Sequence, residues 1–242
     1  MQDYEKDSTF TEEEVDLELL EDVYDEYAAE MQDVLENVIA KIHYAQHVIE
    51  RSSVKRNLIY NIEHRVKKFA STMGKCCDRN YKLSIESIKK NILDVGGIRI
   101  ITYYEDDIYK VADILRHSPG IRVIDEEKDY IQKPKPNGYQ SYHMHISIGL
   151  YSPIIEDVVQ YVVEIQIRDI GMNNWAVIDH DVKYKKNLKP EVAEKITTEL
   201  KHAAELERQA AKIAMEVRDL AAANNLEANT EADQGGSSSV LT

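Results

Sequence analysis

Residues 133–143 read Lys-Pro-Lys-Pro-Asn-Gly-Tyr-Gln-Ser-Tyr-His, and residues 163–168 read Val-Glu-Ile-Gln-Ile-Arg. Polar and apolar residues alternate in both stretches, and a basic turn rich in proline precedes the first one. Successive side chains of a strand point to opposite faces, so the alternation predicts two antiparallel strands with one polar face. The polar positions are Tyr139, Ser141, His143 and His145 in the first strand and Glu164, Gln166 and Arg168 in the second.

The types of residue on this polar face are informative as well. An ordinary sheet with one face in water explains the alternation without any function. An aromatic ring, a His, a carboxylate and an Arg on one face are, however, the groups that bind a nucleotide and a metal ion. The pattern therefore indicates a candidate nucleotide site on the sheet.

The rest of the chain predicts helices on both sides of these strands. Apolar residues at helical spacing, capping residues and breakers predict helices at 12–50, 54–79, 84–91, 107–117, 170–184 and 190–224. β-branched and aromatic runs predict strands at 98–104, 121–125, 128–132, 139–150 and 158–168. We expect an α+β fold with a mixed sheet of about five strands between long N- and C-terminal helices. The expected boundaries are a disordered N-terminus at 1–11, one domain at 12–224 and a flexible tail at 225–242.

The charge is concentrated at the ends of the chain. The net charge is −14, and residues 1–30 hold thirteen acids and one base. Residues 31–224 hold 29 bases and 28 acids, so the body is nearly neutral and gives no support to a general nucleic-acid-binding surface. No apolar run has membrane-spanning length, and the two adjacent cysteines match no metal or redox spacing. These features predict a cytoplasmic protein without membrane contact.

Two further motifs carry charges that suit a polyphosphate. Lys67, Ser71 and Lys75 would share one stripe of the helix predicted at 54–79, although a lysine stripe taken alone is more often a solvated helix face. Asp94 precedes a Gly-Gly turn and Arg99 follows it, although an ordinary loop with a capping Asp is the commoner explanation of this motif taken alone. Neither motif matches a Walker loop or a Rossmann fingerprint.

The only tryptophan and its neighbours give a weaker signal. Trp175 lies at helical spacing with apolar residues, which is typical of core packing. His180 stands between two aspartates, but adjacent residues on a helix cannot face one metal ion. We therefore expect no metal site at His180.

Taken in order along residues 50–220, these segments resemble the synthetase domain of RelA/SpoT-type enzymes, and in particular the single-domain small alarmone synthetases. The matching text is Arg65-Val-Lys67, Asp94-Val-Gly-Gly-Ile-Arg99, Gly138-Tyr-Gln-Ser-Tyr-His143, Val163-Glu-Ile-Gln-Ile-Arg168, Met172-Asn-Asn-Trp-Ala and Asp179-His180 with Tyr184-Lys185. The resemblance implies a nucleotidyltransferase-like fold and a GTP pyrophosphokinase. Such enzymes transfer pyrophosphate from ATP to the 3′-hydroxyl of GDP or GTP, which gives the alarmones ppGpp and pppGpp of the stringent response.

Carried over residue by residue, the resemblance implies two groups of site residues. For ATP, Arg65 and Arg99 would hold the adenine, with Lys67, Ser71 and Lys75 on the phosphates. Asp94 and Glu164 would bind Mg²⁺, and Glu164 would also accept the proton of the acceptor hydroxyl. For GDP or GTP, Tyr139 would stack on guanine near Asn173, Lys135 and His143 would meet the 5′-phosphates, and Gln166 and Arg168 would support the floor of the site.

The sequence also departs from the family pattern. Asp78 lies near the end of the predicted 54–79 helix, where the family usually keeps basic residues, and Asp179 replaces a usual glutamate. Residues 58–64 do not match the allosteric alarmone site of some tetrameric members, so we do not expect stimulation by alarmone. The resemblance implies a homo-oligomer, a tetramer in those members. Two alternatives stay open: a toxic relative that pyrophosphorylates the 3′ end of tRNA, and a catalytically inactive nucleotide-sensing module.

Overall fold

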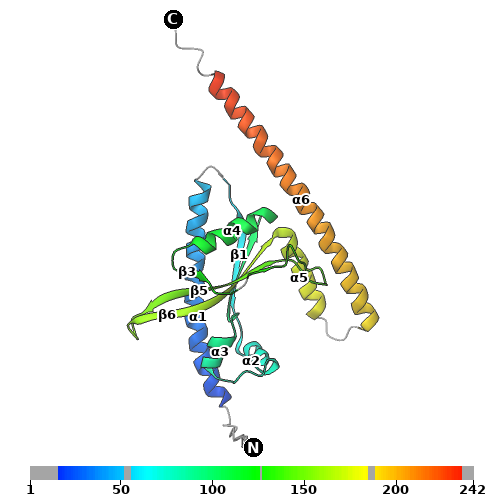
Figure 1. Cartoon of the computed structure of the whole chain (residues 1–242). Coiled ribbons are helices and arrows are strands. Elements are labelled where there is room, and N and C mark those ends of the chain that lie inside the picture. Colours follow the sequence, from blue (N-terminus) through cyan, green and yellow to red (C-terminus); the bar gives the residue numbers. More distant parts are fainter. Residues whose placement is uncertain (1–15, 52–55, 126, 185–188, 236–242) are drawn as a thin grey trace, which may run out of the picture.

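One mixed sheet of six strands organises the chain (Figure 1). The computed structural model describes residues 16–51, 56–125, 127–184 and 189–235. Its strands are β1 (Ile59–Val66), β2 (Gly96–Thr102), β3 (Ile121–Val123), β4 (Lys128–Asp129), β5 (Tyr142–Ser152) and β6 (Asp157–Asp169). Their order is β1-β2-β6-β5-β3, with β4 paired to β5; β2 and β6 are parallel and the other pairs are antiparallel. The expected α+β class with a mixed sheet is confirmed.

Helices pack on one face of this sheet and at its end. They are α1 (Leu17–Glu50), α2 (Phe69–Asp78), α3 (Ile85–Asn91), α4 (Glu105–His117), α5 (Ile170–Tyr184) and α6 (Pro190–Gly235). α1 and α4 contact β2 and β6, whose apolar positions Ile98, Ile100, Ile165 and Ile167 are buried. Each such fully buried side chain contributes about 1.5–3 kcal/mol relative to exposure. The opposite face stays free for polar residues.

The first helix shows how the sequence produces this packing. Asp16 caps α1 by accepting hydrogen bonds from the backbone nitrogens of Glu18 and Leu19, both at 3.1 Å. The buried stripe of α1 is Leu20, Tyr24, Tyr27, Met31, Val34, Leu35, Val38 and Ile42. It lies so close to β2 that a Cβ on Gly96 would be 2.5 Å from Met31 Sδ. Position 96 therefore requires a glycine because α1 approaches β2 closely, and not because the backbone has an unusual dihedral angle.

The prediction of one helix at 54–79 is wrong. The first half of this segment contains the edge strand β1, and only Phe69–Asp78 is helical. The apolar residues Ile59, Ile62 and Val66 have helix-like spacing. A register shift between Ile59 and Asn61 interrupts the period of two, and the strand's other face is exposed. Lys67, Ser71 and Lys75 are consequently not one helical stripe, since Lys67 precedes α2.

The other predicted elements are present with shifted ends. The predicted helix 190–224 is α6, which continues to Gly235 and so enters the segment expected to be a flexible tail. The expected disordered N-terminus at 1–11 lies outside the described residues. None of the described helices combines the length and apolarity needed to cross a membrane.

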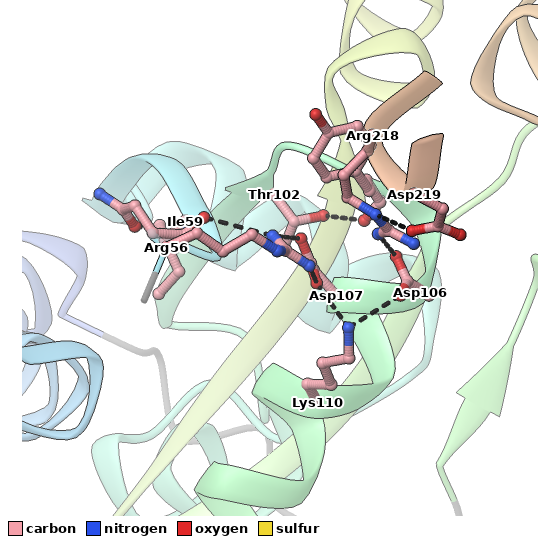
Figure 2. Close-up of polar contacts among 10 residues, drawn as sticks. Arg56, Ile59, Thr102, Asp106, Asp107, Lys110, Arg218 and Asp219 are labelled. Carbon is pink, nitrogen blue, oxygen red and sulfur yellow. Dashed lines mark hydrogen bonds and ion pairs between the residues drawn. The ribbon is translucent and has the colours of Figure 1, made fainter. Parts of the chain in front are cut away.

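α6 lies along one side of the body and then extends past it (Figure 1). Its first turns pack on α5, where Trp175 Nε1 donates to the Leu200 carbonyl at 2.6 Å. Farther along, Arg218 Nη1 donates to Asp106 Oδ1 at 2.6 Å, at the start of α4 (Figure 2). Arg56 makes two further bonds to the buried Asp107 beside this contact. α6 is thus held at two points along its length, at Leu200 and at Arg218.

Candidate active site

The strand register brings the polar residues of four strands into two rows on one face of the sheet. Residues paired directly across neighbouring strands lie on the same face. The first row is Glu63, Arg99, Gln166 and His143, and the second is Arg65, Gly97, Glu164 and His145. The predicted polar face of β5 and β6 is therefore confirmed, and β1 and β2 extend it. Glu164 lies in the middle of the second row.

A carboxylate between two lysines dominates the part of this face beside β1 and β2. Asp94 Oδ2 lies 2.7 Å from Lys67 Nζ, and Asp94 Oδ1 lies 2.7 Å from Lys75 Nζ. Burial alone would raise the pKa of Asp94, but the two ammonium groups outweigh it and hold that pKa below its usual value. The predicted ATP residues Lys67, Lys75 and Asp94 are thus brought together, although in contacts with one another.

The backbone fixes the position of these lysines. The Lys67 nitrogen donates to the Val95 carbonyl at 2.8 Å. Tyr24 Oη, from α1, donates to the Lys67 carbonyl at 2.6 Å and lies 2.8 Å from Thr72 Oγ1 of α2. Ser71, also on α2, is exposed. The segment that joins β1 to α2 is therefore held against the loop that carries Asp94.

The two predicted adenine-binding arginines border a pocket in front of this cluster. Its lining includes Arg65, Arg99, Asp94, Glu164 and Gln166. Arg99 Nη1 is 2.9 Å from Glu63 Oε2, and buried Arg99 Nε has no hydrogen-bond partner in the described part of the chain. A Cβ on Gly97 would meet only the Arg65 carbonyl at 4.0 Å, so the glycine leaves open space between the rows. The two guanidinium groups of this lining can contact the base or the phosphates of a nucleotide.

A chain of hydrogen bonds connects the predicted acceptor residues. Arg168 Nη2 donates to Tyr139 Oη at 2.8 Å, and Tyr139 Oη lies 2.8 Å from His143 Nε2. His143 Nδ1 lies 3.4 Å from Glu164 Oε1, whose second oxygen accepts from Gln166 Nε2 at 3.0 Å. The neutral tautomer that satisfies both His143 contacts carries its proton on Nδ1 and accepts the Tyr139 proton on Nε2. The chain orients Glu164 from one side.

The charges along this chain follow from burial and neighbours. Burial lowers the pKa of His143 and outweighs the opposing effect of Glu164, so the imidazole is neutral at pH 7. Burial alone would raise the pKa of Glu164, but His143 and Gln166 reverse the direction and the net pKa is lowered. Glu164 is therefore a half-buried carboxylate that is ionised at neutral pH and held in one orientation. Such a group can act as a base or as a ligand of a cation.

Tyr139 and its surroundings form the far end of the site. Its ring packs edge-on against Trp175 with the centroids 6.2 Å apart, and Lys135 Nζ lies 4.8 Å from the ring centroid. Asn173, on α5, has a buried Oδ1 that accepts no hydrogen bond from a described residue. Trp175 is 3% exposed, which confirms its expected place in the core. Lys135 and His143, two of the predicted acceptor residues, thus lie around the ring of Tyr139.

Asp94 and Glu164 are the two predicted ligands of a metal ion. They are close enough for the charge of Asp94 to oppose ionisation of Glu164. Among the described residues, no group of three or more His, Cys, Asp or Glu could hold a metal ion by itself. Mg²⁺ keeps several waters and takes phosphate oxygens, so two carboxylates and a nucleotide fit its needs.

Sequence reasoning named Arg65 on β1 but missed two other polar residues of that strand. Glu63 is the counter-ion of Arg99, and His64 also lines the pocket. Both were hidden because residues 54–79 were taken as one helix. A signal existed in the β-branched residues Ile59, Ile62 and Val66, which favour a strand.

Comparisons with known proteins agree with this geometry. Residues 64–189 match the family model described as a region found in RelA / SpoT proteins. GTP pyrophosphokinase YwaC of Bacillus subtilis is 40% identical over 161 residues, which cover 64% of this chain and 74% of YwaC.

Solved structures show the same fold. The crystal structure of small alarmone synthetase 1 from Bacillus subtilis bound to its product pppGpp has a TM-score of 0.70 and 27% identity, over 81% of this chain and 96% of that one. The same synthetase bound to AMPCPP has a TM-score of 0.67 and 26% identity, over 83% of this chain and 98% of that one. With more than half of its residues inside the matched region, this chain belongs to the RelA/SpoT family and has the fold of its small alarmone synthetases.

Proposed function

We propose that this chain transfers pyrophosphate from ATP to the 3′-hydroxyl of GDP or GTP and so makes ppGpp or pppGpp. The observation that carries the proposal is the position of Glu164. It lies on the polar face between the Asp94–lysine cluster and the Tyr139–His143 chain. A relative named as a GTP pyrophosphokinase and a related structure named as bound to pppGpp support the assignment.

The reaction needs positioning and charge neutralisation more than covalent help from the protein. The 3′-oxygen forms a bond to the β-phosphorus of ATP, the bond from that phosphorus to the α–β bridging oxygen breaks, and AMP leaves. Glu164 accepts the proton of the 3′-hydroxyl. Lys67 and Lys75 stabilise the charge on the phosphates, while Arg65 and Arg99 hold the adenine.

We propose that Asp94 and Glu164 hold Mg²⁺ together with the phosphates of ATP. The ion would neutralise phosphate charge and lower the barrier to displacement. Both oxygens of Asp94 are engaged by lysines in this structure. Metal binding therefore implies an exchange in which Lys67 and Lys75 pass from Asp94 to the phosphates.

On the acceptor side, Tyr139 stacks on guanine beside Asn173. Lys135 and His143 meet the 5′-phosphates, and Gln166 and Arg168 hold Glu164 and Tyr139 in place. The planar ring of Tyr139 lies just before β5 and suits stacking on a base. Stacking of a base on an aromatic side chain contributes about 1–3 kcal/mol in proteins that bind single-stranded nucleic acids.

The test is product analysis with purified protein, labelled ATP and three acceptors: GDP, GTP and bulk tRNA, each at low and moderate salt. We expect labelled ppGpp or pppGpp and no labelled tRNA. A tRNA-modifying enzyme would show a steep salt dependence, because it neutralises many backbone phosphates. Labelling of the tRNA 3′ end with free guanine nucleotides untouched would contradict the proposal, and absence of any product would favour the inactive sensing module.

We also propose that copies of the chain associate through α6. Its residues Leu206, Ala210, Ile213, Val217 and Leu220 recur with alternating spacings of four and three, and all are exposed. Such a seam is typical of helices that pair with other helices. Light scattering should give a mass above that of one chain. Ile213→Glu should lower that mass, while Glu216→Gln, which leaves all five seam residues unchanged, should not.

A further inference from the structure

α6 packs against the loop that carries Lys135 and Tyr139, although it begins at Pro190, after the matched family region ends at residue 189. The loop before β5 packs directly on it at Gly138, whose φ is +92°. A Cβ on Gly138 would lie 2.9 Å from Ala204 Cβ and 3.1 Å from Lys201 Cα. Lys201 therefore leaves the helix beside the loop that carries Lys135 and Tyr139.

Packing and an ion pair hold α6 in place beside this loop. Leu200 and Ala204 form a small core with Trp175, and Tyr139 packs against it. Beyond the loop, the ion pair of Arg218 with Asp106 holds the next part of the helix against α4 (Figure 2). The helix face between these two anchors cannot turn away from the loop without breaking one of them.

A groove runs between this helix face and residues 131–140. Its basic lining residues are Lys135 from the loop and Lys201, His202, Arg208 and Lys212 from α6. The α6 positions 201, 205, 208 and 212 follow helical spacing, so they form one stripe along the groove. At 1.5 Å per residue, Lys201 and Arg208 are about 10 Å apart along the axis.

The cations of the groove differ in how they are paired. Arg208 bonds Glu205 at 2.8–3.1 Å. Burial raises the pKa of Glu105, a second acid in the lining, and the charges of Lys212 and Arg208 only partly oppose that rise. Lys201 is exposed and has no ion-pair partner within the described ranges. Gln140, only 7% exposed, also lines the groove, and its Oε1 accepts no hydrogen bond from a described residue. Among the described cations that α6 contributes to this groove, the ammonium group of Lys201 is thus left without an ion pair, whereas Arg208 is paired with Glu205.

We propose that Lys201 binds the terminal 5′-phosphate of the acceptor, so that this chain favours GTP over GDP. The inference rests on the proposed function, in which Lys135 meets the nearer 5′-phosphates. A longer polyphosphate reaches from Lys135 farther toward α6 and carries an additional negative charge. The flexible ammonium group of lysine suits a phosphate at variable reach.

The experiment measures direct binding of GTP and GDP by titration calorimetry, without ATP. The proteins are the unchanged chain, Lys201→Gln, Lys201→Arg and the control Lys195→Gln, which removes an exposed lysine of α6 outside the groove. We expect the unchanged chain to bind GTP more tightly than GDP. Lys201→Gln should weaken GTP about tenfold and GDP less than about twofold, as for one charged hydrogen bond. Lys201→Arg should keep most of the preference, and Lys195→Gln should change neither affinity.

The outcomes separate the inference from the function on which it rests. Equal affinities for GTP and GDP in the unchanged chain, or equal losses in Lys201→Gln, would overturn the role of Lys201. A Lys201→Gln variant that loses affinity for bulk tRNA but not for GTP would overturn it too, and would assign the groove to a polynucleotide. Selective GTP binding without any pyrophosphate transfer would leave the binding role supported and contradict the proposed reaction.

Discussion

The two halves of the polar face manage charge in different ways. In the donor half, formed by β1, β2 and α2, cations and carboxylates neutralise one another directly: Lys67 and Lys75 on Asp94, and Arg99 on Glu63. In the acceptor half, around β5, β6 and the loop before β5, the central groups form a hydrogen-bonded chain through Tyr139 and neutral His143. In the proposed reaction the cations of the donor half exchange partners when ligands bind, whereas the groups of the acceptor half are already linked by hydrogen bonds.

Two acids show the same contrast. Asp94 has two ammonium partners, and its pKa is lowered. Asp169, at the end of β6, is 3% exposed and has no cation among its described neighbours that lowers its pKa. Burial raises the pKa of Asp169 to about 6, and Glu105 and Glu207 add to the effect, while hydrogen bonds from the Met172 and Gly171 nitrogens oppose it. The comparison predicts that removing the charge of Asp94 harms activity, whereas removing the charge of Asp169 increases the free energy of unfolding.

Replacement of Glu164, which lies between the two halves, should give the largest effect on activity. Glu164→Gln keeps the shape and the Gln166 contact but removes the basic oxygen and the charge. Turnover should fall by about 10³-fold, because the variant loses both the base and one charge on the metal ion. ATP affinity should stay within a few-fold, because the arginines and lysines proposed to hold ATP are unchanged. Single-turnover kinetics with an ATP titration measures both. A loss of turnover below about tenfold would remove Glu164 from the role of base.

In the donor half, Asp94→Asn should cost about 10²-fold in activity at low Mg²⁺, and added Mg²⁺ should restore part of it. An amide oxygen remains a weaker ligand, and the freed lysines compete less for the site. The measurement is the dependence of rate on Mg²⁺ concentration. Asp78→Asn, at the exposed end of α2, is the control and should leave the dependence unshifted. The same curve for Asp94→Asn and the unchanged chain would exclude Asp94 from a metal site.

The two halves also differ in how far the sequence predicts them. The acceptor half lies on β5 and β6, where a period of two is visible within each strand and assigns Glu164, Gln166 and His143 to one face. The donor half depends on β1, an edge strand whose register shift disguises the period. Local pattern reasoning therefore made a helix of it and missed Glu63.

Contacts between distant residues could not be predicted at all. Asp94 binds Lys67 and Lys75, which are 27 and 19 positions away, and only the pairing of β1 with β2 brings the three together. The resemblance to a family named the same residues for the site but did not show that they pair with one another. The packing of α6 on the loop at Gly138 is equally nonlocal, so the role of Lys201 emerged only from the structure.

In the acceptor half, Tyr139→Ala should raise the acceptor KM more than the ATP KM. Loss of a stacking ring costs about 1–3 kcal/mol, or roughly 5- to 150-fold. Tyr139→Phe keeps the ring but removes the hydroxyl between Arg168 and His143, so it should raise the acceptor KM less and lower kcat through a less constrained His143. Steady-state kinetics with each substrate varied separates the two effects. Equal changes in both KM values would instead identify Tyr139 as a structural residue of the small core with Trp175.

The smallest expected effect concerns the stability cost of Asp169. Its folded-state pKa of about 6 lies above the unfolded value near 3.8. The folded state therefore holds its proton more tightly, and stability is lost as pH rises from about 4 to above 6. Asp169→Asn keeps an oxygen that can accept from the Met172 nitrogen, a 2.7 Å contact, and removes the charge. We expect the variant to gain about 1–3 kcal/mol at pH 8 and little at pH 4. Urea unfolding at both pH values measures the difference.

Asp16→Asn, at the exposed cap of α1, is the matched control and should show no such gain. A gain for Asp169→Asn that is equal at pH 4 and pH 8 would show that packing, rather than the buried charge, distinguishes this acid from Asp94.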